Sequence, residues 1–148
     1  MEKPYAQIIE ALPYGPGFCF VDGLQHLSEN SVEGFYTFAA KAPFYEHHFP
    51  GHPVTPGVLL TECMAQIGLV CLGYYLLGMP AAAPAFALSE SQVLYEQPVP
   101  PQTTVTVKAR KIYWRLGKLK CAVSLYLPSG KCACHGTLSG ILTQKNVP

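Results

Sequence analysis

Charged residues are scarce in this sequence, and acidic residues are absent from its second part. Charged side chains make up 13% of the 148 residues, whereas hydrophobic ones make up 49%. Such a chain has little polar surface for a free monomer, so we expect an apolar face that meets another subunit. All nine Asp and Glu lie at or before Glu96, and eight of the ten Lys and Arg follow it. We therefore also expect a basic face.

The sequence lacks internal repeats and low-complexity segments, and its first residues do not lead us to expect a secretory leader. A single domain over residues 1–148 is expected, because a chain of this length can bury one core. Six cysteines occur at positions 19, 63, 71, 121, 132 and 134. Without a leader, we interpret them as reduced thiols, used mainly for packing, in a cytoplasmic protein.

One apolar run, 58–79, is long enough to raise the question of a membrane span. It contains Glu62 and Gln66, however, and an acidic side chain near the centre of a bilayer is costly. We therefore predict a buried helix over about 58–78, ended by the sequence "GMP", and no membrane partner. Because this helix is apolar on nearly all sides, other elements must wrap around it.

Most of the remaining sequence is typical of β-strands. A short helix is predicted over 5–12, and the Pro- and Gly-rich "PYGPGF" at 13–18 predicts a tight loop. Aromatic and β-branched residues predict six strands, over 18–27, 31–38, 85–95, 103–114, 118–127 and 131–142. The fold class is therefore α+β, with an antiparallel six-stranded sheet around one long central helix.

The stretch "HHFPGHPVTPGVLLTECMAQ", residues 47–66, carries the candidate catalytic groups. Its prolines hold the segment after His48 in a rigid, extended path. The helix is expected to begin at Gly57 or Val58, so the free N–H groups of its first turn point back towards this loop and attract negative charge. Glu62 follows among apolar neighbours, which raise the pKa of its carboxyl group.

This stretch therefore offers a base, an acid and an anion-stabilising helix terminus. Removal of a proton next to a carbonyl and loss of a β-hydroxyl group need these three components. The residues alone leave a structural interpretation open, in which Glu62 only binds backbone groups or a lysine and His48 only bonds a carbonyl. A metal site at the three loop histidines is disfavoured, because no Cys or Asp completes a zinc spacing.

"HFPGHPVTPGVLLTECMAQ" resembles the signature H-F-P-G-x-P-x-x-P-G-V-L-x-x-E-x-x-A-Q of the hot-dog-fold 3-hydroxyacyl-acyl-carrier-protein dehydratases. The resemblance implies a hot-dog fold and a homodimer whose sheets join edge to edge, with a higher oligomer or a heteromer with a related subunit also open. It further implies active sites at the dimer interface, where His48 of one subunit faces Glu62 of the other.

The implied reaction is dehydration of a 3-hydroxyacyl thioester on acyl carrier protein to a trans-2-enoyl thioester, in fatty acid or polyene biosynthesis. His48 would be the base, Glu62 the acid, and Gly57 with Val58 would bind the thioester carbonyl. No metal or organic cofactor is expected, because the thioester itself stabilises the enolate. Four aromatic residues are candidates to bound the acyl tunnel, namely Tyr74, Tyr75, Phe86 and Tyr95.

Two other functions remain open. A hot-dog acyl thioesterase would use the same helix and a carboxylate to activate water, and a non-catalytic acyl-binding subunit would keep only the fold. A basic stripe is expected at Lys108, Arg110, Lys118 and Lys120, which is either a solvated sheet surface or an attraction for an acidic carrier protein. No base-reading motif accompanies this charge, so nucleic acid is not expected as a partner. The "PYGPGF" segment departs from the P-H-R-Y-P-F that relatives commonly have, which favours a specialised pathway.

Overall fold

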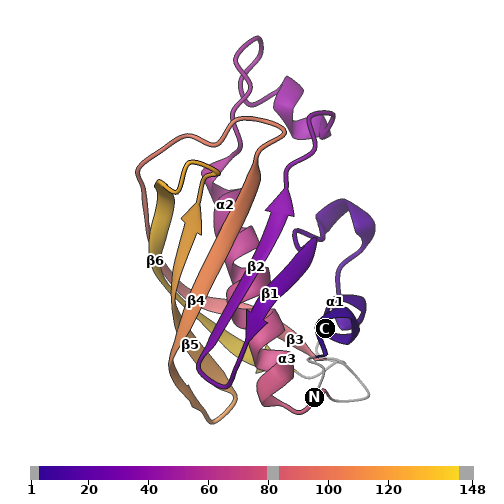
Figure 1. Cartoon of the computed structure of the whole chain (residues 1–148), viewed down its shortest axis with the longest axis vertical. Coiled ribbons are helices and arrows are strands. Elements are labelled where there is room, and N and C mark those ends of the chain that lie inside the picture. Colours follow the sequence, from indigo (N-terminus) through magenta and orange to yellow (C-terminus); the bar gives the residue numbers. More distant parts are fainter. Residues whose placement is uncertain (1–3, 80–83, 144–148) are drawn as a thin grey trace.

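The apolar run forms one long central helix, and an antiparallel sheet curves around it (Figure 1). The computed structural model describes residues 4–79 and 84–143. A short helix, α1 (Tyr5–Ala11), precedes the sheet, and two 3-10 turns, η1 (Pro16–Phe18) and η2 (Pro43–Glu46), lie in the connecting loops. The expected α+β arrangement of a helix wrapped by six strands is confirmed.

The six strands form a single sheet in the order β1-β2-β4-β5-β6-β3, and every neighbouring pair is antiparallel. Their bounds are β1 (Gly23–Leu27), β2 (Ser31–Thr37), β3 (Ala85–Tyr95), β4 (Thr104–Arg115), β5 (Lys118–Tyr126) and β6 (Cys132–Thr143). β3 follows the helix in sequence but pairs only with the last strand. It therefore lies at one edge of the sheet, where no other described strand pairs with the outer side of its backbone.

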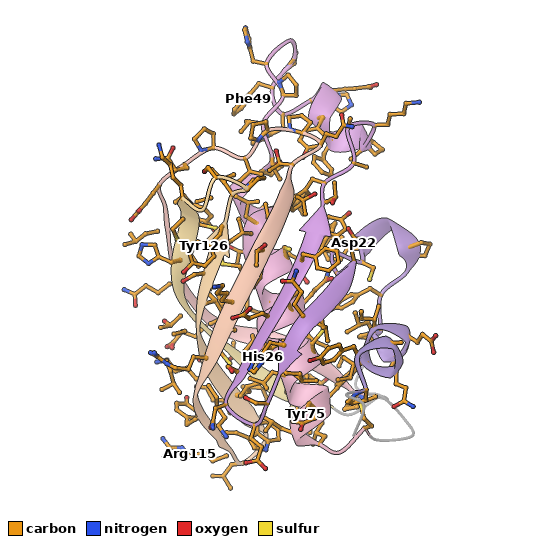
Figure 2. The ribbon with its side chains drawn as sticks, viewed as in Figure 1. Asp22, His26, Phe49, Tyr75, Arg115 and Tyr126 are labelled. Atoms are coloured by element: carbon orange, nitrogen blue, oxygen red, sulfur yellow. The ribbon has the colours of Figure 1, made fainter. Side chains whose placement is uncertain are left out.

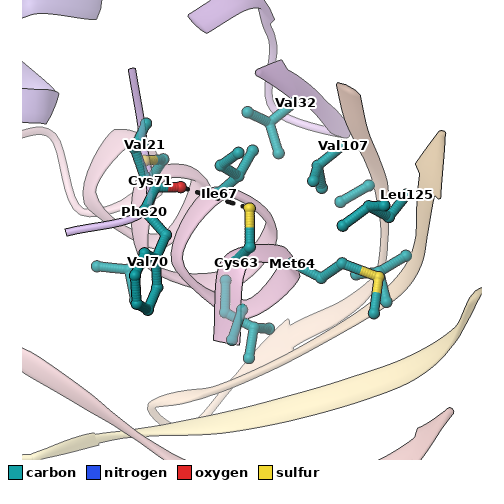
Figure 3. Packing of buried hydrophobic residues seen from close by; sticks show 14 of the residues in the cluster. Phe20, Val21, Val32, Cys63, Met64, Ile67, Val70, Cys71, Val107 and Leu125 are labelled. Carbon is teal, nitrogen blue, oxygen red and sulfur yellow. Dashed lines mark hydrogen bonds between the residues drawn. The ribbon is translucent and has the colours of Figure 1, made fainter. Parts of the chain in front are cut away.

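The predicted first strand was wrong at its start. Residues 18–22 were expected to be β-structure, but β1 begins at Gly23 and Phe18 ends the turn η1. The reason is that the backbone of this segment bonds to side chains of the central helix. The side chain of Gln66 bonds the carbonyl of Phe18 and the N–H of Phe20, and the Cys63 thiol donates to the Phe20 carbonyl (Figure 3).

The central helix begins at Gly57, as expected, but it is not α-helical throughout. It runs as α2 (Gly57–Ala65), a π-helical segment η3 (Gln66–Cys71) and α3 (Leu72–Leu76). The π-helical middle was not predicted. A further error is the end of the helix, which comes at Leu76, two residues before the predicted position. Gly78 has a φ of 74°, and the N–H groups of Gly78 and Met79 bond back to the carbonyls of Tyr75 and Tyr74, which closes the last turn.

The core lies between this helix and the concave face of the sheet (Figure 3). Met64 and Ile67 on the helix and Val107 and Leu125 on the sheet are all 0% exposed. The 20 residues from Gly57 to Leu76 are long and apolar enough to cross a membrane, but 72% of the most apolar window is buried inside the protein. This stretch is thus the core helix of the fold, as the position of Glu62 predicts.

Candidate active site

His48 lies in the loop before the central helix, at the end of the molecule where Phe49 is labelled in Figure 2. Its N–H donates to the carbonyl of Phe44 over 3.0 Å, and its own carbonyl accepts from the N–H of Val54 over 2.9 Å. The ring Nδ1 is 2.9 Å from the carbonyl oxygen of Val54. Because a carbonyl only accepts, Nδ1 carries the proton, and Nε2 of the neutral ring holds the lone pair of a base.

The same loop is tied down again just before the helix. The N–H of Thr55 donates to the carbonyl of Val99 over 2.9 Å, and its hydroxyl is 2.6 Å from that of Tyr45. Both of these hydroxyl-bearing side chains are buried. The loop that carries His48 is therefore anchored by backbone hydrogen bonds at His48 and again at Thr55.

The start of the central helix offers free N–H groups. Pro56 precedes the helix and provides no side-chain cap, and its carbonyl accepts from the N–H groups of Leu59 and Leu60. The N–H groups of Gly57 and Val58 have no acceptor within the described part of the chain. Val58 is 75% exposed, so this terminus is open to a ligand. The two N–H groups and the helix dipole suit an oxygen that gains negative charge.

Glu62 is half-buried, and a single side chain determines its orientation. The amide Nε2 of Gln66 donates to Oε2 of Glu62 over 3.0 Å and also to the Phe18 carbonyl, while its Oε1 accepts from the N–H of Phe20. Gln66 is itself 0% exposed. Burial raises the pKa of Glu62 above its ordinary value, and the hydrogen bond from Gln66 opposes that rise. The carboxyl group thus has a larger protonated fraction near neutral pH than an exposed one.

No hydrogen bond or ion pair joins His48 to Glu62 within the single chain, although both belong to its described part. The ring of His48 stacks on Phe49, at 4.3 Å between centroids, and that side chain is exposed. Glu62 instead bonds to its own helix. The chain alone therefore presents two separate halves of the expected acid–base pair.

Sequence reasoning missed Tyr14 and the helix contact of Tyr95. Tyr14 comes from the "PYGPGF" turn, where burial and then the negative charge of Glu62 raise the pKa of its phenol. Its only sequence signal was the departure from the family pattern at that position. Tyr95 was predicted to bound a tunnel, but its ring also contacts the helix start at Gly57. No local pattern pairs residues so distant in sequence.

Known proteins are similar to this chain in sequence and in fold. The family model of the FabA-like domain matches residues 12–135. The chain belongs to the FabA-like family. It is 31% identical over 136 residues to the 3-hydroxyacyl-[acyl-carrier-protein] dehydratase FabZ of Thermus thermophilus, covering 92% of this chain and 94% of that protein. Against the FabZ dehydratase of Desulforamulus reducens it is 37% identical over 116 residues, covering 75% of this chain and 79% of the other.

Solved structures confirm the hot-dog fold of this FabA-like chain. The dehydratase heterocomplex ApeI:P from Xenorhabdus doucetiae superposes with a TM-score of 0.77 at 16% identity, covering 93% of this chain and 91% of that one. A hypothetical thioesterase with coenzyme A from Streptococcus pneumoniae has a TM-score of 0.59 at 10% identity, with 84% and 87% covered. These low identities show the fold alone, whereas the sequence relatives favour a dehydratase over a thioesterase.

Proposed function

We propose that this FabA-like protein dehydrates 3-hydroxyacyl thioesters carried on acyl carrier protein to trans-2-enoyl thioesters. One observation carries the proposal beyond family membership. The chain places a histidine with an available Nε2 before an uncapped helix start, and a half-buried carboxyl group one turn into that helix. A base, an oxyanion site and an acid are the groups that β-elimination next to a thioester carbonyl requires.

In the proposed mechanism, Nε2 of His48 takes a proton from C2 of the substrate. The N–H groups of Gly57 and Val58 bind the thioester oxygen, on which negative charge develops. Protonated Glu62 then gives its proton to the hydroxyl group on C3, and the C–O bond breaks to release water. The proton on His48 returns to Glu62 through solvent, so that one water leaves per substrate and no electrons are exchanged.

Gln66 determines which oxygen of Glu62 reacts. Its amide donates to Oε2, so this oxygen is an acceptor and the acidic proton resides on Oε1. That leaves Oε1 to face the substrate hydroxyl. A fixed carboxyl group of this kind loses little orientational freedom in the transition state, which is one source of rate enhancement.

We infer that the complete site forms between two subunits. The edge strand β3 leaves one side of its backbone unpaired within the chain and exposes Leu88 and Leu94, which are 48% and 61% exposed. Pairing of two β3 strands would cover these side chains and bring His48 of one chain to Glu62 of the other. Higher oligomers, or a heteromer with a related subunit, would use the same edge. The solved relative ApeI:P is itself a heterocomplex.

The basic stripe supports only a general attraction of the carrier protein and not a docking site beside His48. Lys108 pairs with Glu33 at 3.9 Å, and Lys120 pairs with Glu90 at 3.7 Å, so both charges are partly neutralised on the sheet surface. Arg115, at the end of the same hairpin, lies at the opposite end of the molecule from Phe49 (Figure 2). The stripe thus attracts an acidic carrier in general rather than forming a docking site beside His48 of the same chain.

All six cysteines are free thiols, which fits the proposed location in the cytoplasm.

The test incubates the protein with 3-hydroxyacyl carrier proteins of graded chain length, saturated and polyunsaturated. A dehydratase forms the conjugated enoyl thioester, followed by absorbance or mass, and releases no thiol to a trapping reagent. A thioesterase releases free thiol instead. His48→Ala should lower kcat by about 10²–10⁴-fold, the usual contribution of a general base. His52→Ala, four residues along the same loop, is the matched control. A wild-type rate in His48→Ala, or thiol release without enoyl product, would refute the proposal.

A further inference from the structure

Tyr95 is the last residue of the edge strand β3, and its ring lies directly against the start of the central helix. A Cβ atom built on Gly57 would be only 3.1 Å from Cε1 of Tyr95 and 3.3 Å from Cδ1. Such separations are shorter than ordinary packing contacts between carbon atoms. Gly57 therefore allows an aromatic ring to cover the backbone of the first helical residue.

The other end of the same side chain reaches the next turn of the helix. The hydroxyl of Tyr95 is hydrogen-bonded to the hydroxyl of Thr61. One side chain thus spans the whole first turn, from Gly57 to Thr61. Glu62 follows immediately in the helix, so the ring and the hydroxyl together hold the turn that carries the oxyanion site and adjoins the acid.

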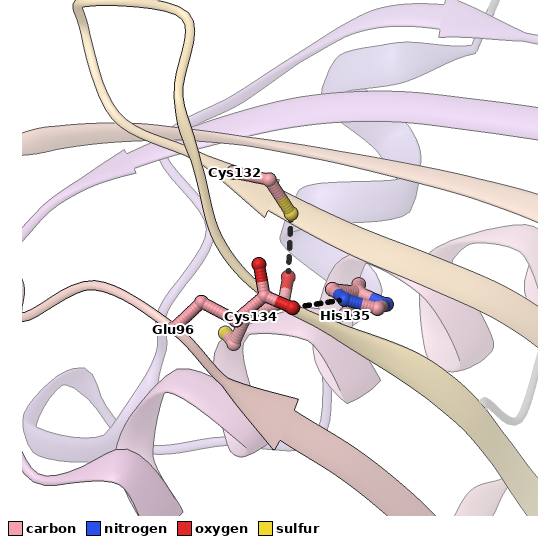
Figure 4. Close-up of polar contacts among 4 residues, drawn as sticks. All are labelled: Glu96, Cys132, Cys134 and His135. Atoms are coloured by element: carbon pink, nitrogen blue, oxygen red, sulfur yellow. Dashed lines mark hydrogen bonds and ion pairs between the residues drawn. The ribbon is translucent and has the colours of Figure 1, made fainter.

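The position of Tyr95 is itself well defined. The residue pairs with Cys134 on β6, and the N–H groups of the next two residues, Glu96 and Gln97, donate to the carbonyl of Ala133 over 2.7 and 3.1 Å. The carboxylate of Glu96 is 2.9 Å from Nε2 of His135 (Figure 4). The end of β3 is therefore held by four contacts to the neighbouring strand, which makes Tyr95 a firm support for the helix.

A restraint of this type is needed because the helix start cannot be capped in the usual way. A side-chain cap would bond the first N–H groups, and it would then block them from a ligand. Pro56 provides no such cap, and uncapped first turns fray. Tyr95 restrains the turn from outside, through the Cα of Gly57 and the hydroxyl of Thr61, and leaves the N–H groups free.

The outer side of the ring is accessible. Tyr95 is 50% exposed and forms one wall of a cleft of about 290 Å³, which Thr55, Gly57, Leu60 and Val99 also line. The ring and the helix start at Gly57 thus line the same cleft. Because Tyr95 ends the edge strand, its contacts also connect that strand to the proposed oxyanion site.

We propose that Tyr95, with Thr61, is a positioning residue that fixes the N–H groups of Gly57 and Val58 for the thioester carbonyl. This inference rests on the proposed dehydratase function for its kinetic consequences. Its structural part does not depend on that function, because the restraint on the first turn of the helix exists with or without a substrate.

The test compares Tyr95→Phe, Thr61→Val and the double variant with the wild type. Tyr95→Phe keeps the ring, and Thr61→Val keeps the side-chain shape, so each removes only a hydroxyl. Each single variant should lower kcat by about threefold to tenfold with KM changed less than about twofold, the range for one neutral hydrogen bond. The double variant should be no slower than the slower single variant, because both lose the same contact.

Amide hydrogen exchange provides the second measurement. Residues 59–61, whose N–H groups lie beyond the two free ones, should exchange faster in both single variants, while the sheet amides keep their wild-type rates. Tyr113→Phe removes a phenol from the far hairpin and should change neither measurement. Light scattering at the assay concentration checks that Tyr95→Phe keeps the oligomeric mass of the wild type. If it does not, the result for Thr61→Val decides the test, because Thr61 lies on the helix and not on the edge strand.

Three results would overturn the inference: unchanged exchange at 59–61, unchanged kcat in both single variants, or a rise in KM alone. Failure of the proposed function looks different. In that case the wild-type protein itself forms no enoyl product, and the exchange comparison still decides whether the side chain of Tyr95 restrains the helix start.

Discussion

The His48 loop and the Glu62 helix hold the two proposed catalytic groups in opposite ways. His48 bonds through Nδ1 to a backbone carbonyl, that of Val54. Glu62 accepts a hydrogen bond from a side chain, the buried amide of Gln66. A backbone acceptor survives the replacement of its side chain, whereas an amide donor does not. The comparison shows that the base should tolerate changes around it and that the acid should not.

Gln66→Met should lower the stability more than any other substitution considered, because it removes every hydrogen bond that the amide of Gln66 makes. The carbonyl of Phe18 and the N–H of Phe20 lose their partner, and each unsatisfied buried group costs about 1–3 kcal/mol. We expect the free energy of unfolding to fall by about 2–4 kcal/mol, measured by urea denaturation at fixed protein concentration.

The same substitution should move the pH dependence of kcat. The Gln66 bond lowers the pKa of Glu62, so its loss raises that pKa further. Because the acid must be protonated to react, the alkaline limb of the profile should shift to higher pH. Cys63→Ala is the matched control, since its buried thiol bonds the same backbone segment, at the Phe20 carbonyl, but donates no hydrogen bond to Glu62. A limb that moves equally in both variants would contradict the role of Gln66.

Glu62→Gln should change the stability less than Gln66→Met does, and the change should depend on pH. Burial raises the pKa of Glu62 in the folded protein, so the folded state binds this proton more tightly than the unfolded state. The wild type therefore loses stability as pH rises from the ordinary carboxyl value through the raised one. Glu62→Gln lacks this loss, so its stability relative to the wild type should be higher at pH 8 than at pH 4. The difference should be at most about 1 kcal/mol, because the half-exposed group is screened. Thermal unfolding at pH 4 and pH 8 measures the difference; a constant difference would argue against the raised pKa.

Val54→Ala should have the smallest effect. The carbonyl that accepts from His48 Nδ1 belongs to the backbone and remains after the substitution. Only a partly buried side chain is shortened, so kcat should change by less than about twofold. A tenfold change would require a rise of about 1.4 kcal/mol in the activation free energy. Steady-state kinetics with the carrier-bound substrate are sufficient for this measurement. A large fall in kcat would mean that side-chain packing, and not the backbone, places the base.

Local sequence patterns predicted much of the fold. The bounds of β3 and the helix start at Gly57 agree with the structure, because alternation and the proline-rich loop are local signals. The errors lie where distant residues decide. Residues 18–22 have a strand composition, yet their backbone bonds to Gln66 and Cys63, more than 40 positions away. The π-helical segment likewise has no local signal, and at Gly68 a Cβ would lie 3.1 Å from both Ala109 and Val123.

For the candidate site, too, only the part that a local sequence pattern carries was predictable. The family signature named His48 and Glu62 as catalytic candidates, and the helix start followed from the Pro-Gly pair at 56–57. Their supports were not predictable, because Tyr95 reaches Gly57 and Thr61 from a strand that begins nine residues after the helix. The chemistry of such a site is encoded in one short stretch, while its positioning depends on the tertiary fold.

The central claim is that each site combines His48 of one chain with Glu62 of another. The most direct test mixes chains carrying His48→Ala with chains carrying Glu62→Gln, after reversible dissociation. Random pairing makes half of the dimers mixed, and each mixed dimer then has one intact site, so roughly a quarter of the wild-type rate should return. If both groups came from the same chain, no mixed dimer would contain an intact site. A mixture as inactive as the two separate variants, with mixed dimers verified by mass, would contradict the account.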